Sequence, residues 1–496
     1  MPAHPDGPTE DIDFDVADLD VAALRERVRA ILPGVRSDLE ALVRIPSVSA
    51  AAFDAAHLEA GAAAVAGLLR GAGLTDVEIL AVEAAGRVGA PAVVGRRPAP
   101  DGAPTVLLYA HHDVQPPGDV SVWASDPFEP QERDGRLYGR GAADDKAGIM
   151  VHVAALRALG EALGVGVTVF VEGEEEVGSP TFTAFLAEYR ERLAADVIVV
   201  ADSGNWRLGR PALTTSLRGL VDGVIEVSTL DHAVHSGLYG GAVPDAVTVL
   251  LRLLATLWDD GGDLAVAGLV SGKAGDLGYS EADLRADAGV LDGVQLIGSG
   301  SLESRLWTRP CVTVVGMDIP TVATASNTLQ ATARAKFSLR LAPGQDPDAA
   351  FRALADHVRT HTLWGARSQV LLGEAGQAFA EDVDGPVYDL ARWALEQAWG
   401  VAPVHMGMGG SIPFIAELAA VYPAATVLVT GVEDPDGRAH GENESVHLGE
   451  FERACVAQTL LLAALAGRSV SRSAGRSVSQ SVGKSAGRAG AAPVRG

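Results

Sequence analysis

The chain has 496 residues, enough for two domains and a large buried core. Apolar residues make up 48% of it, which excludes disorder of the chain as a whole. Its formal net charge is −25 at pH 7. A surface this acidic repels phosphate backbones and anionic lipid, so we expect neither nucleic acid nor a membrane as a partner.

The cysteines and the N-terminal residues indicate the cellular compartment. Only two cysteines occur, Cys311 and Cys455, far apart and outside any metal or redox motif, as expected in a reducing cytosol. The first twenty residues carry acids but no Lys or Arg, so no secretory signal is visible. No apolar run reaches the length needed to span a bilayer. We therefore predict a cytoplasmic protein.

The first half of the chain has the pattern of an α/β fold. Helical stretches alternate with short apolar runs of the kind that forms buried strands. The predicted strands are 105–110, 165–171 and 196–201, and the predicted helices are 19–44, 146–163 and 181–193. This alternation predicts a mostly parallel central sheet flanked by helices. In such sheets, ligands bind at the carboxyl ends of the strands.

The pattern changes between about 213 and 376, where two predicted helices lie among four predicted strands. The strands are 219–228, 311–318, 330–341 and 368–372, and the helices are 244–258 and 346–360. We interpret this part as an inserted α+β domain of the ferredoxin-like kind. Residues 259–307, rich in Gly, Asp and Ser, form a long excursion within it. The larger domain then resumes with helix 387–399, strand 426–430 and a last helix from 448.

These patterns divide the chain into five parts. The larger domain takes residues 19–212 and 377–466, and the inserted domain takes 213–376. Residues 1–18 are an acidic lead. Residues 467–496 form a degenerate repeat of small, polar and basic residues that cannot bury a core, so we predict that this tail is disordered.

Histidines and carboxylates follow the predicted strands of the larger domain. They occur as His111-His112-Asp113, Asp144-Asp145, the acidic run from Glu172 to Glu176, Asp202, and His440-Gly441-Glu442-Asn443. Taken alone, each group is more typical of a structural histidine or a solvated acidic surface. Together they would place many like charges at one sheet edge, which is costly unless a pair of divalent cations neutralises them. Neutral imidazole and carboxylate oxygen suit zinc or manganese.

Several longer motifs carry a resemblance to a known family. Residues 109–116 read YAHHDVQP, 126–130 read DPFEP, 235–241 read HSGLYGG and 409–413 read GGSIP. In this order they resemble the M20-type dinuclear-metal hydrolases, which include carboxypeptidase G2, succinyl-diaminopimelate desuccinylase, aminoacylase and carnosine-type dipeptidases. The resemblance covers about 41–467 and is strongest to the dipeptidase branch. It implies two metal ions and hydrolysis of an amide bond.

Carried over by position, the resemblance implies a set of metal ligands. Asp144 would bridge two ions, of which one is also held by His111 and Asp202 and the other by Glu176 and His440. In the family the peptide bond after the bridging aspartate is cis, so the same is expected here. The implied metal is zinc, with manganese and cobalt as alternatives.

The resemblance also implies the catalytic groups. Glu175 would be the general base, and Asp113 would hydrogen-bond His111 and fix its orientation. Two cations about 4 Å apart can share a water, lower its pKa and stabilise both oxygens of a tetrahedral intermediate. A free carboxylate beside them can take the proton of this water nucleophile and return it to the leaving amine. Since no implied ligand or base is missing, we expect an enzyme rather than a silent peptide-binding relative.

The inserted domain contributes further implied residues. His235 matches a histidine that, in dimeric relatives, reaches into the partner subunit's site and stabilises the oxyanion. Asn327 and Arg340 match positions that contact substrate, and Arg340 suits a bidentate grip on a terminal carboxylate. From the larger domain, Ser411 on its Gly-Gly turn could add a hydrogen bond to the substrate. A salt bridge on the strand surface is the alternative for Arg340. The resemblance therefore implies a homodimer and a lid that closes over the site.

We predict a metallopeptidase that cleaves dipeptides or short peptides with a free C-terminal carboxylate. The alternative is an N-acyl-amino-acid deacylase, because such enzymes share every metal residue in the family. One departure concerns recognition: Gly407-Met408 stands where animal dipeptidases carry Arg-Glu. This change leaves the metal residues intact but argues against carnosine-like specificity.

Overall fold

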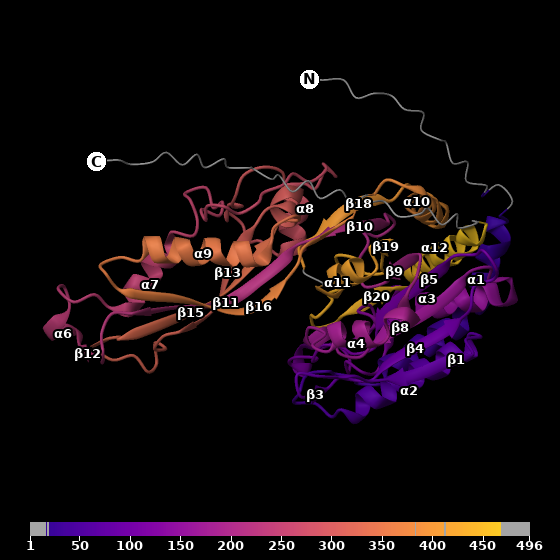
Figure 1. Cartoon of the computed structure of the whole chain (residues 1–496), viewed down its shortest axis with the longest axis horizontal. Coiled ribbons are helices and arrows are strands. Elements are labelled where there is room, and N and C mark those ends of the chain that lie inside the picture. Colours follow the sequence, from indigo (N-terminus) through magenta and orange to yellow (C-terminus); the bar gives the residue numbers. More distant parts are fainter. Residues whose placement is uncertain (1–15, 17–18, 382, 411–412, 468–496) are drawn as a thin grey trace, which may run out of the picture.

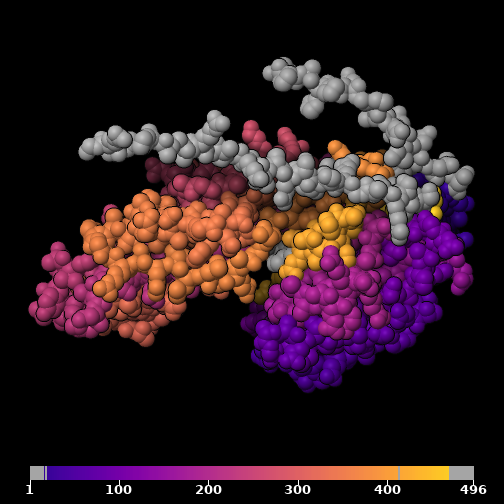
Figure 2. Space-filling model, in the orientation of Figure 1, coloured from indigo at the N-terminus to yellow at the C-terminus, as the bar shows by residue number. Residues whose placement is uncertain are grey.

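The computed structural model describes residues 16, 19–381, 383–410 and 413–467. These residues form a larger and a smaller α/β unit that lie at opposite ends of the molecule (Figure 1). The space-filling view shows them as two lobes with a notch between them (Figure 2). The predicted disordered tail and nearly all of the acidic lead lie outside the described residues.

The larger unit is built on a nine-stranded sheet with a parallel centre. Its central strands are, in spatial order, β8 (Gly166–Glu172), β5 (Thr105–His111), β9 (Val197–Val200) and β19 (Thr426–Val429). All four overlap the apolar runs from which strands were predicted, so the predicted mostly parallel sheet is confirmed. The sheet also has antiparallel edges, which were not predicted. One edge is formed by β4 (Ala92–Arg97) and β1 (Asp76–Leu80), and the other by β10 (Ala212–Leu217) and β17 (Phe379–Ala380). The remaining strand, β18 (Val404–Met408), pairs parallel with β10.

Helices cover both faces of this sheet, which explains why its central strands are continuously apolar. One face packs against α1 (Val21–Val43), α2 (Ala56–Gly71), α3 (Lys146–Leu159), α10 (Pro386–Trp399) and α12 (Leu448–Ala466). The other packs against α4 (Phe182–Glu188), α5 (Arg190–Leu193) and α11 (Pro413–Val421). Along β5, Leu108 and Ala110 point into the first core and Leu107 and Tyr109 into the second. This alternation follows from the two-residue period of a strand.

The smaller unit has the predicted ferredoxin-like arrangement. Its antiparallel sheet has the order β13 (Cys311–Asp318), β15 (Thr332–Leu341), β11 (Gly219–Ser228) and β16 (Arg367–Gly376). The helices α7 (Ala246–Ala255) and α9 (Pro347–His361) cover one face and form a separate core with it. Since β10 belongs to the large sheet and the small sheet begins at Gly219, the chain crosses between the units at Arg218.

Shorter elements complete the fold. In the smaller unit, the predicted excursion contains α8 (Glu281–Ala288), and a π-helical turn (Ser304–Thr308) lies at its end. The far tip of the smaller unit consists of β12 (Val234–His235), α6 (Ser236–Tyr239) and β14 (Thr328–Leu329) (Figure 1). In the larger unit, β2 (Glu83–Ala84) pairs with β3 (Arg87–Val88), and β6 (Gln131–Arg133), β7 (Arg136–Tyr138) and β20 (Ser445–His447) form a small sheet. Three-residue 3₁₀ turns occur at Val120–Val122, Gly160–Ala162 and Glu175–Val177. Within the described residues, no helix is long and apolar enough to cross a bilayer.

Candidate metal centre

Two of the predicted ligands lie at the carboxyl ends of neighbouring parallel strands. His111 is the last residue of β5, and Asp202 follows the end of β9 by two residues. The register pairs Tyr109 with Val200, so His111 and Asp202 reach the same level of the sheet edge. The His111 Nε2 atom lies 3.8 Å from Asp202 Oδ1. The sheet therefore brings together two residues that are far apart in the sequence.

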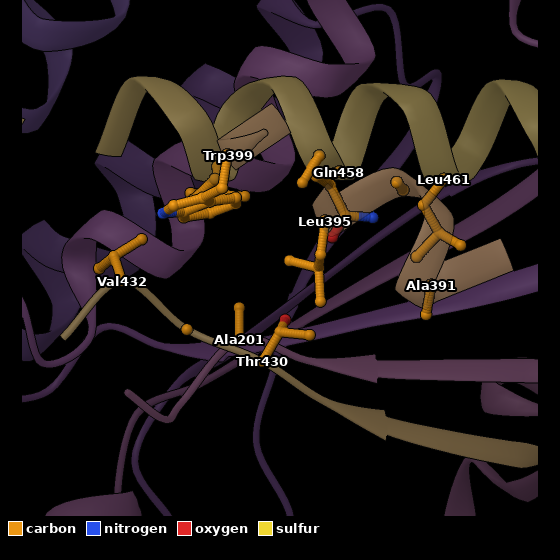
Figure 3. A pocket seen from close by; sticks show the side chains of 13 residues that line it. Ala201, Ala391, Leu395, Trp399, Thr430, Val432, Gln458 and Leu461 are labelled. Carbon is orange, nitrogen blue, oxygen red and sulfur yellow. The ribbon is translucent and has the colours of Figure 1, made fainter. Parts of the chain in front are cut away.

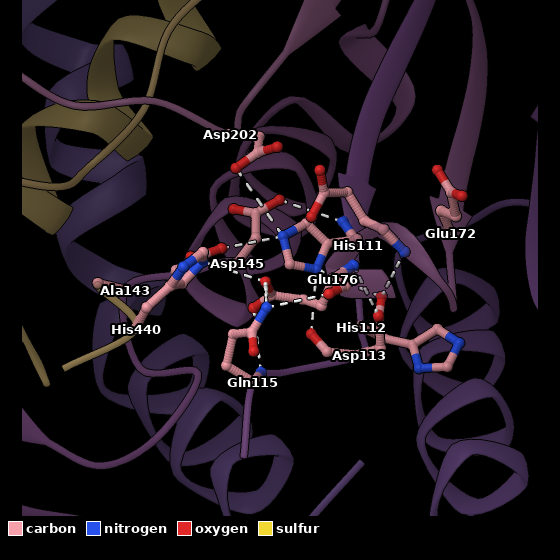
Figure 4. Close-up of polar contacts among 12 residues, drawn as sticks. His111, His112, Asp113, Gln115, Ala143, Asp145, Glu172, Glu176, Asp202 and His440 are labelled. Atoms are coloured by element: carbon pink, nitrogen blue, oxygen red, sulfur yellow. Dashed lines mark hydrogen bonds and ion pairs between the residues drawn. The ribbon is translucent and has the colours of Figure 1, made fainter. Parts of the chain in front are cut away.

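Asp144 lies between two histidines. Its Oδ1 atom is 2.9 Å from His111 Nε2, and its Oδ2 atom is 2.9 Å from His440 Nε2. Glu176 Oε2 lies 3.0 Å from the same nitrogen of His440. Figure 4 shows His111, Glu176, Asp202 and His440 turned toward one another. The peptide bond between Asp144 and Asp145 is cis, as expected from the resemblance.

The donor atoms fall into two groups that could each hold a metal ion. Among the described residues these groups are His111 with Asp144 and Asp202, and Asp144 with Glu176 and His440. Within each group the donor atoms lie within 4.8 Å of one another, and Asp144 belongs to both groups. The structure thus brings together all five predicted ligands, in the two sets that the resemblance implies.

The electrostatics of these groups suit cations. Burial raises the pKa of Asp202 to about 7, and the negative charges of Asp144 and Glu176 add to this effect. Hydrogen bonds to Asp144 and Glu176 raise the pKa of the His440 imidazole to about 11. The shift of His440, and part of the shift of Asp202, reflect nearby negative charges that favour a positive charge between these side chains. A divalent cation would supply it, and carboxylate and imidazole donors without a thiolate suit zinc.

Asp113 contacts both a ligand and the loop after β8. Its backbone oxygen lies 3.0 Å from His111 Nδ1, and its Oδ1 atom lies 3.5 Å from the same nitrogen. Its two carboxylate oxygens accept hydrogen bonds from the backbone N–H groups of Glu175 and Glu176, at 3.2 and 3.0 Å. The side chain of Asp113 is fully buried. It can therefore fix the orientation of the His111 ring and the position of the glutamates at the same time.

The predicted base differs from the other acids of its run in the contacts that its carboxylate makes with described residues. Among the described residues, the carboxylate of Glu175 makes no hydrogen bond or ion pair, whereas Gln115 donates to Glu176 Oε2 at 2.9 Å. Burial raises the pKa of Glu175 well above its usual range, and the charge of Asp202 adds to the shift. An unpaired carboxylate next to the donor groups can accept a proton, as the base assignment requires.

The remaining acids of the run are structural. Glu172 accepts a hydrogen bond from the Tyr109 hydroxyl at 2.7 Å. Glu174 accepts from the backbone and the hydroxyl of Thr181, at 2.8 and 2.5 Å. Both residues are buried, and neither belongs to one of the two donor groups. This agrees with the sequence interpretation, which gave them no catalytic role.

Two predicted residues of the inserted domain lie far from these donor groups. His235 is exposed at the tip of the smaller unit, in the ribbon of β12 and β14 (Figure 1). Asn327 lies beside it, because its carbonyl oxygen accepts a hydrogen bond from the N–H of Ser236 at 2.9 Å. The structure therefore groups His235 with Asn327 but does not bring either one to the metal ligands of the same chain.

Arg340 lies at the opposite end of the small sheet, close to the crossing between the two units. It is half-buried on β15, opposite Leu220 and Cys311. Burial lowers its pKa, and the positive charge of Arg218 adds to this effect. Arg218 in turn donates to the carbonyl oxygen of Gly409 at 3.1 Å, so both arginines lie near the Gly-Gly turn of the larger unit. Ser411, the last predicted contact, lies outside the described residues.

Sequence reasoning missed several polar residues around the site. Gln115 holds Glu176, while Arg140 and Glu444 connect the loops of two ligands. Burial and the charges of Asp144 and Asp202 raise the pKa of Glu433 well above its usual range. Gln115 lies in the motif at 109–116, and Glu444 follows the His440 motif by one residue. Their places beside motifs were the only available signal, because long-range contacts fix their roles.

A cavity of about 30 Å³ lies on the helix side of the sheet, between the strand ends and the helices α10 and α12 (Figure 3). Leu395, Trp399 and Leu461 line it together with Ala201 and Thr430. The cavity has room for about one water molecule and is too small for a dipeptide. The donor groups at the strand ends therefore remain the candidate site.

Comparisons with known proteins give one family. The family model described as "Peptidase family M20/M25/M40" matches residues 107–464. A cysteinylglycine-S-conjugate dipeptidase of Corynebacterium striatum is 37% identical over 377 residues, which cover 75% of this chain and 83% of that protein. A Beta-Ala-His dipeptidase of Rattus norvegicus is 28% identical over 69% of this chain and 73% of its own length.

A solved structure shows the same fold. The dipeptidase Dug1p of Saccharomyces cerevisiae superimposes with a TM-score of 0.76 at 20% sequence identity. The match covers 90% of this chain and 98% of that chain, so it includes both units. At this level of identity the likeness concerns the fold alone.

Proposed function

The chain belongs to peptidase family M20/M25/M40 and is a hydrolytic enzyme, and we propose that it is a dipeptidase that works with two zinc ions. Its substrates would be dipeptides or short peptides with a free C-terminal carboxylate. The position of Asp144 carries this proposal, because each of its two oxygens faces a different histidine. Such a carboxylate suits two cations that share a ligand.

Membership of a metallopeptidase family implies divalent metal ions, and the donor groups support the choice of zinc. Tetrahedral zinc sites in hydrolases combine histidine with carboxylate ligands, as both groups do here. Manganese and cobalt accept the same donors and are the alternatives. When bound, two such ions would lower the pKa of a nearby water and stabilise the negative charge that develops on the scissile carbonyl oxygen.

The chain's own residues would move the protons. Glu175 takes a proton from the water as the water oxygen attacks the carbonyl carbon, and later gives this proton to the nitrogen of the leaving amine as the C–N bond breaks. Its raised pKa supports this role, because a buried carboxyl group holds the transferred proton more readily than an exposed one. Asp113 keeps Glu175 and His111 in place through the transfer.

His235 would act in the site of a partner subunit. It is exposed at the tip of the smaller unit, distant from the donor groups of its own chain (Figure 1). In a homodimer formed through the inserted domain, its imidazole could stabilise the oxyanion of the partner's substrate. Asn327 would contact the same substrate, because it lies beside His235. The position of His235, far from the donor groups of its own chain, supports its assignment to the partner's site.

Arg340 would bind the terminal carboxylate of the substrate when the units close over it. Its position near the crossing and next to Arg218 places two positive charges together, which favours an anion between them. The 37% identical relative is named for cysteinylglycine S-conjugates, so we include S-substituted Cys-Gly dipeptides among the proposed substrates.

Hydrolysis of matched substrate pairs tests this function. The protein is treated with a chelator, and cleavage of free dipeptides, S-methyl-Cys-Gly and the corresponding N-acetyl amino acids is measured before and after addition of zinc or manganese. Cleavage of the free dipeptides that returns with metal supports the proposal. Cleavage of only the N-acetyl substrates would identify a deacylase, and binding of metal and dipeptide without turnover would identify a silent relative.

A further inference from the structure

A buried ion pair joins the two loops that carry Asp144 and His440. Arg140 follows β7 and Glu444 precedes β20, and these strands pair antiparallel with Tyr138 opposite Ser445. The Arg140 Nη1 atom donates a hydrogen bond of 2.5 Å to Glu444 Oε2. The two side chains are only 2% and 0% exposed. The small sheet thus places both residues where their loops meet.

Each member of the pair also holds the backbone next to a ligand. The second carboxylate oxygen of Glu444 accepts hydrogen bonds from the N–H groups of Ala143 and Asp144, at 3.0 and 3.2 Å. The Arg140 Nη2 atom donates to the carbonyl oxygens of His440 and Gly441, both at 3.1 Å. One contact fixes the backbone at Asp144 and the other fixes it at His440.

The His440 loop needs such support because its backbone is strained. His440 has a φ of +62°, and Arg438 and Asn443 have φ values of +55° and +60°. Residues other than glycine are uncommon in this left-handed conformation, although Asn and His adopt it more readily than most. His111 and Asp202 do not depend on this loop, because His111 is the last residue of β5 and Asp202 follows β9, both in the middle of the large sheet.

We propose that Arg140 and Glu444 are positioning residues that set the spacing between Asp144 and His440. Through this spacing they determine the affinity of one metal ion, the one held by Asp144, Glu176 and His440. The ion held by His111, Asp144 and Asp202 keeps two ligands on the sheet and is less affected. This inference rests on the proposed two-metal site.

A second buried pair on the same loop provides a matched control. Arg136 donates to both carboxylate oxygens of Asp434, at 3.1 and 2.8 Å, and both residues are buried. This pair also connects the small sheet to the loop before His440. Among the described residues, neither Arg136 nor Asp434 forms a hydrogen bond or ion pair with Asp144 or His440. A purely structural effect of losing a buried pair would therefore also be seen in a variant of Asp434.

The test counts bound zinc in the full-length wild-type chain and in Glu444→Gln, Arg140→Lys and Asp434→Asn. Each protein is dialysed against increasing free zinc, and bound zinc is measured by mass spectrometry. We expect two ions in wild type and Asp434→Asn. In Glu444→Gln and Arg140→Lys, one ion stays tightly bound and the other binds about 10 to 100 times more weakly, as for other groups that orient ligands.

The outcomes separate this inference from the proposed function. Arg140→Lys keeps the charge but cannot reach Glu444 and both carbonyl groups at once, so it decides the matter if Glu444→Gln fails to fold. Two ions bound with wild-type affinity, or equal weakening of both ions, would overturn the positioning role. A wild-type chain that binds no zinc, manganese or cobalt would instead overturn the two-metal site itself.

Discussion

The backbone N–H of Glu176 donates a hydrogen bond to the carboxylate of Asp113 at 3.0 Å, and the N–H of Glu175 donates to the other oxygen of the same group. Asp113 also lies against His111 Nδ1. One buried aspartate therefore connects a proposed ligand on β5 with the loop that carries the proposed base. Asp113 therefore contributes both to the orientation of the His111 ring and to the position of Glu175.

Substitution Asp113→Asn should weaken metal binding and turnover together. The amide has only one acceptor oxygen, so its NH₂ group must face one of the two loop N–H donors or the His111 ring. We expect affinity for zinc to fall about 10- to 100-fold, as it does when other groups behind a ligand are changed. Dialysis against zinc and measurement of kcat with a dipeptide would show this.

Glu172→Gln provides the control for the Asp113 variant. Glu172 is a buried acid at the end of β8, but its carboxylate interacts with the hydroxyls of Tyr109 and Ser179. Among the described residues it accepts no hydrogen bond from the backbone of Glu175 or Glu176, which is bound by Asp113. We expect this variant to keep the zinc affinity of the wild type. An Asp113→Asn variant with unchanged affinity and kcat would mean that Asp113 only fills space.

Substitution Glu175→Gln should separate metal binding from turnover. Glu175 belongs to neither donor group, so both ions should stay bound. Glutamine cannot accept the proton of the attacking water, and loss of a general base lowers kcat by about 10² to 10⁴-fold. Zinc content and kcat measured on the same preparation check this, and wild-type turnover in the variant would contradict the base assignment.

The parts of the fold that were predicted have local causes. Strands such as β5 and β9 are apolar throughout because helices cover both of their faces, and this leaves a signal in the sequence. The edge strand β1 has no such continuous apolar run, since Asp76 and Glu78 interrupt it and all five of its residues are exposed or half-buried. Similarly, β17 has only two residues and forms by pairing with β10. Their strand conformation comes from a neighbour and not from their own pattern.

The candidate site was also predictable only where the sequence carries a local signal. His111, Asp202 and the acidic run that contains Glu176 could be placed at one sheet edge because they follow predicted strands, and the strand-end rule brings such residues together. Assigning the individual ligands, and Glu175 as the base, required the family resemblance. No role could be predicted for Arg140 or Glu444, although Glu444 directly follows the His440 motif. Their roles depend on hydrogen bonds between loops separated by about three hundred residues, which no local pattern records.

Mixing two inactive variants would test the role of His235 in the partner's site. His235→Ala should lose most turnover while keeping its metal ions, because the residue lies far from the donor groups of its own chain. In a dimer of His235→Ala with Glu175→Gln, one site has an intact Glu175 and receives His235 from the other subunit. If subunits pair randomly, about a quarter of all sites regain activity.

Activity measured before and after the two variants are unfolded together and refolded would show this gain. Each variant treated alone in the same way controls for changes caused by refolding. Full activity of His235→Ala alone would contradict the proposed role. A mixture that gains nothing, although mixed dimers form, would place His235 in its own chain's site.

A buried histidine away from the donor groups should make stability depend on pH. His152 lies in α3, and its Nε2 atom is 3.0 Å from the carbonyl oxygen of Tyr109. Burial lowers its pKa from 6.5 to about 4. Between these two pH values the unfolded chain binds a proton at His152 that the folded chain does not bind. The free energy of unfolding therefore falls as pH is lowered through this window, by roughly 3 kcal/mol in total.

The variant His152→Gln can keep the hydrogen bond to Tyr109 but does not titrate, so its stability should fall less over the same window. Urea unfolding of both chains at pH 7 and pH 4.5, with a chelator present throughout, measures the two changes. Other groups contribute equally to both chains, so the difference between the changes belongs to His152. Equal losses of stability in the two chains would mean that His152 is protonated in the folded state.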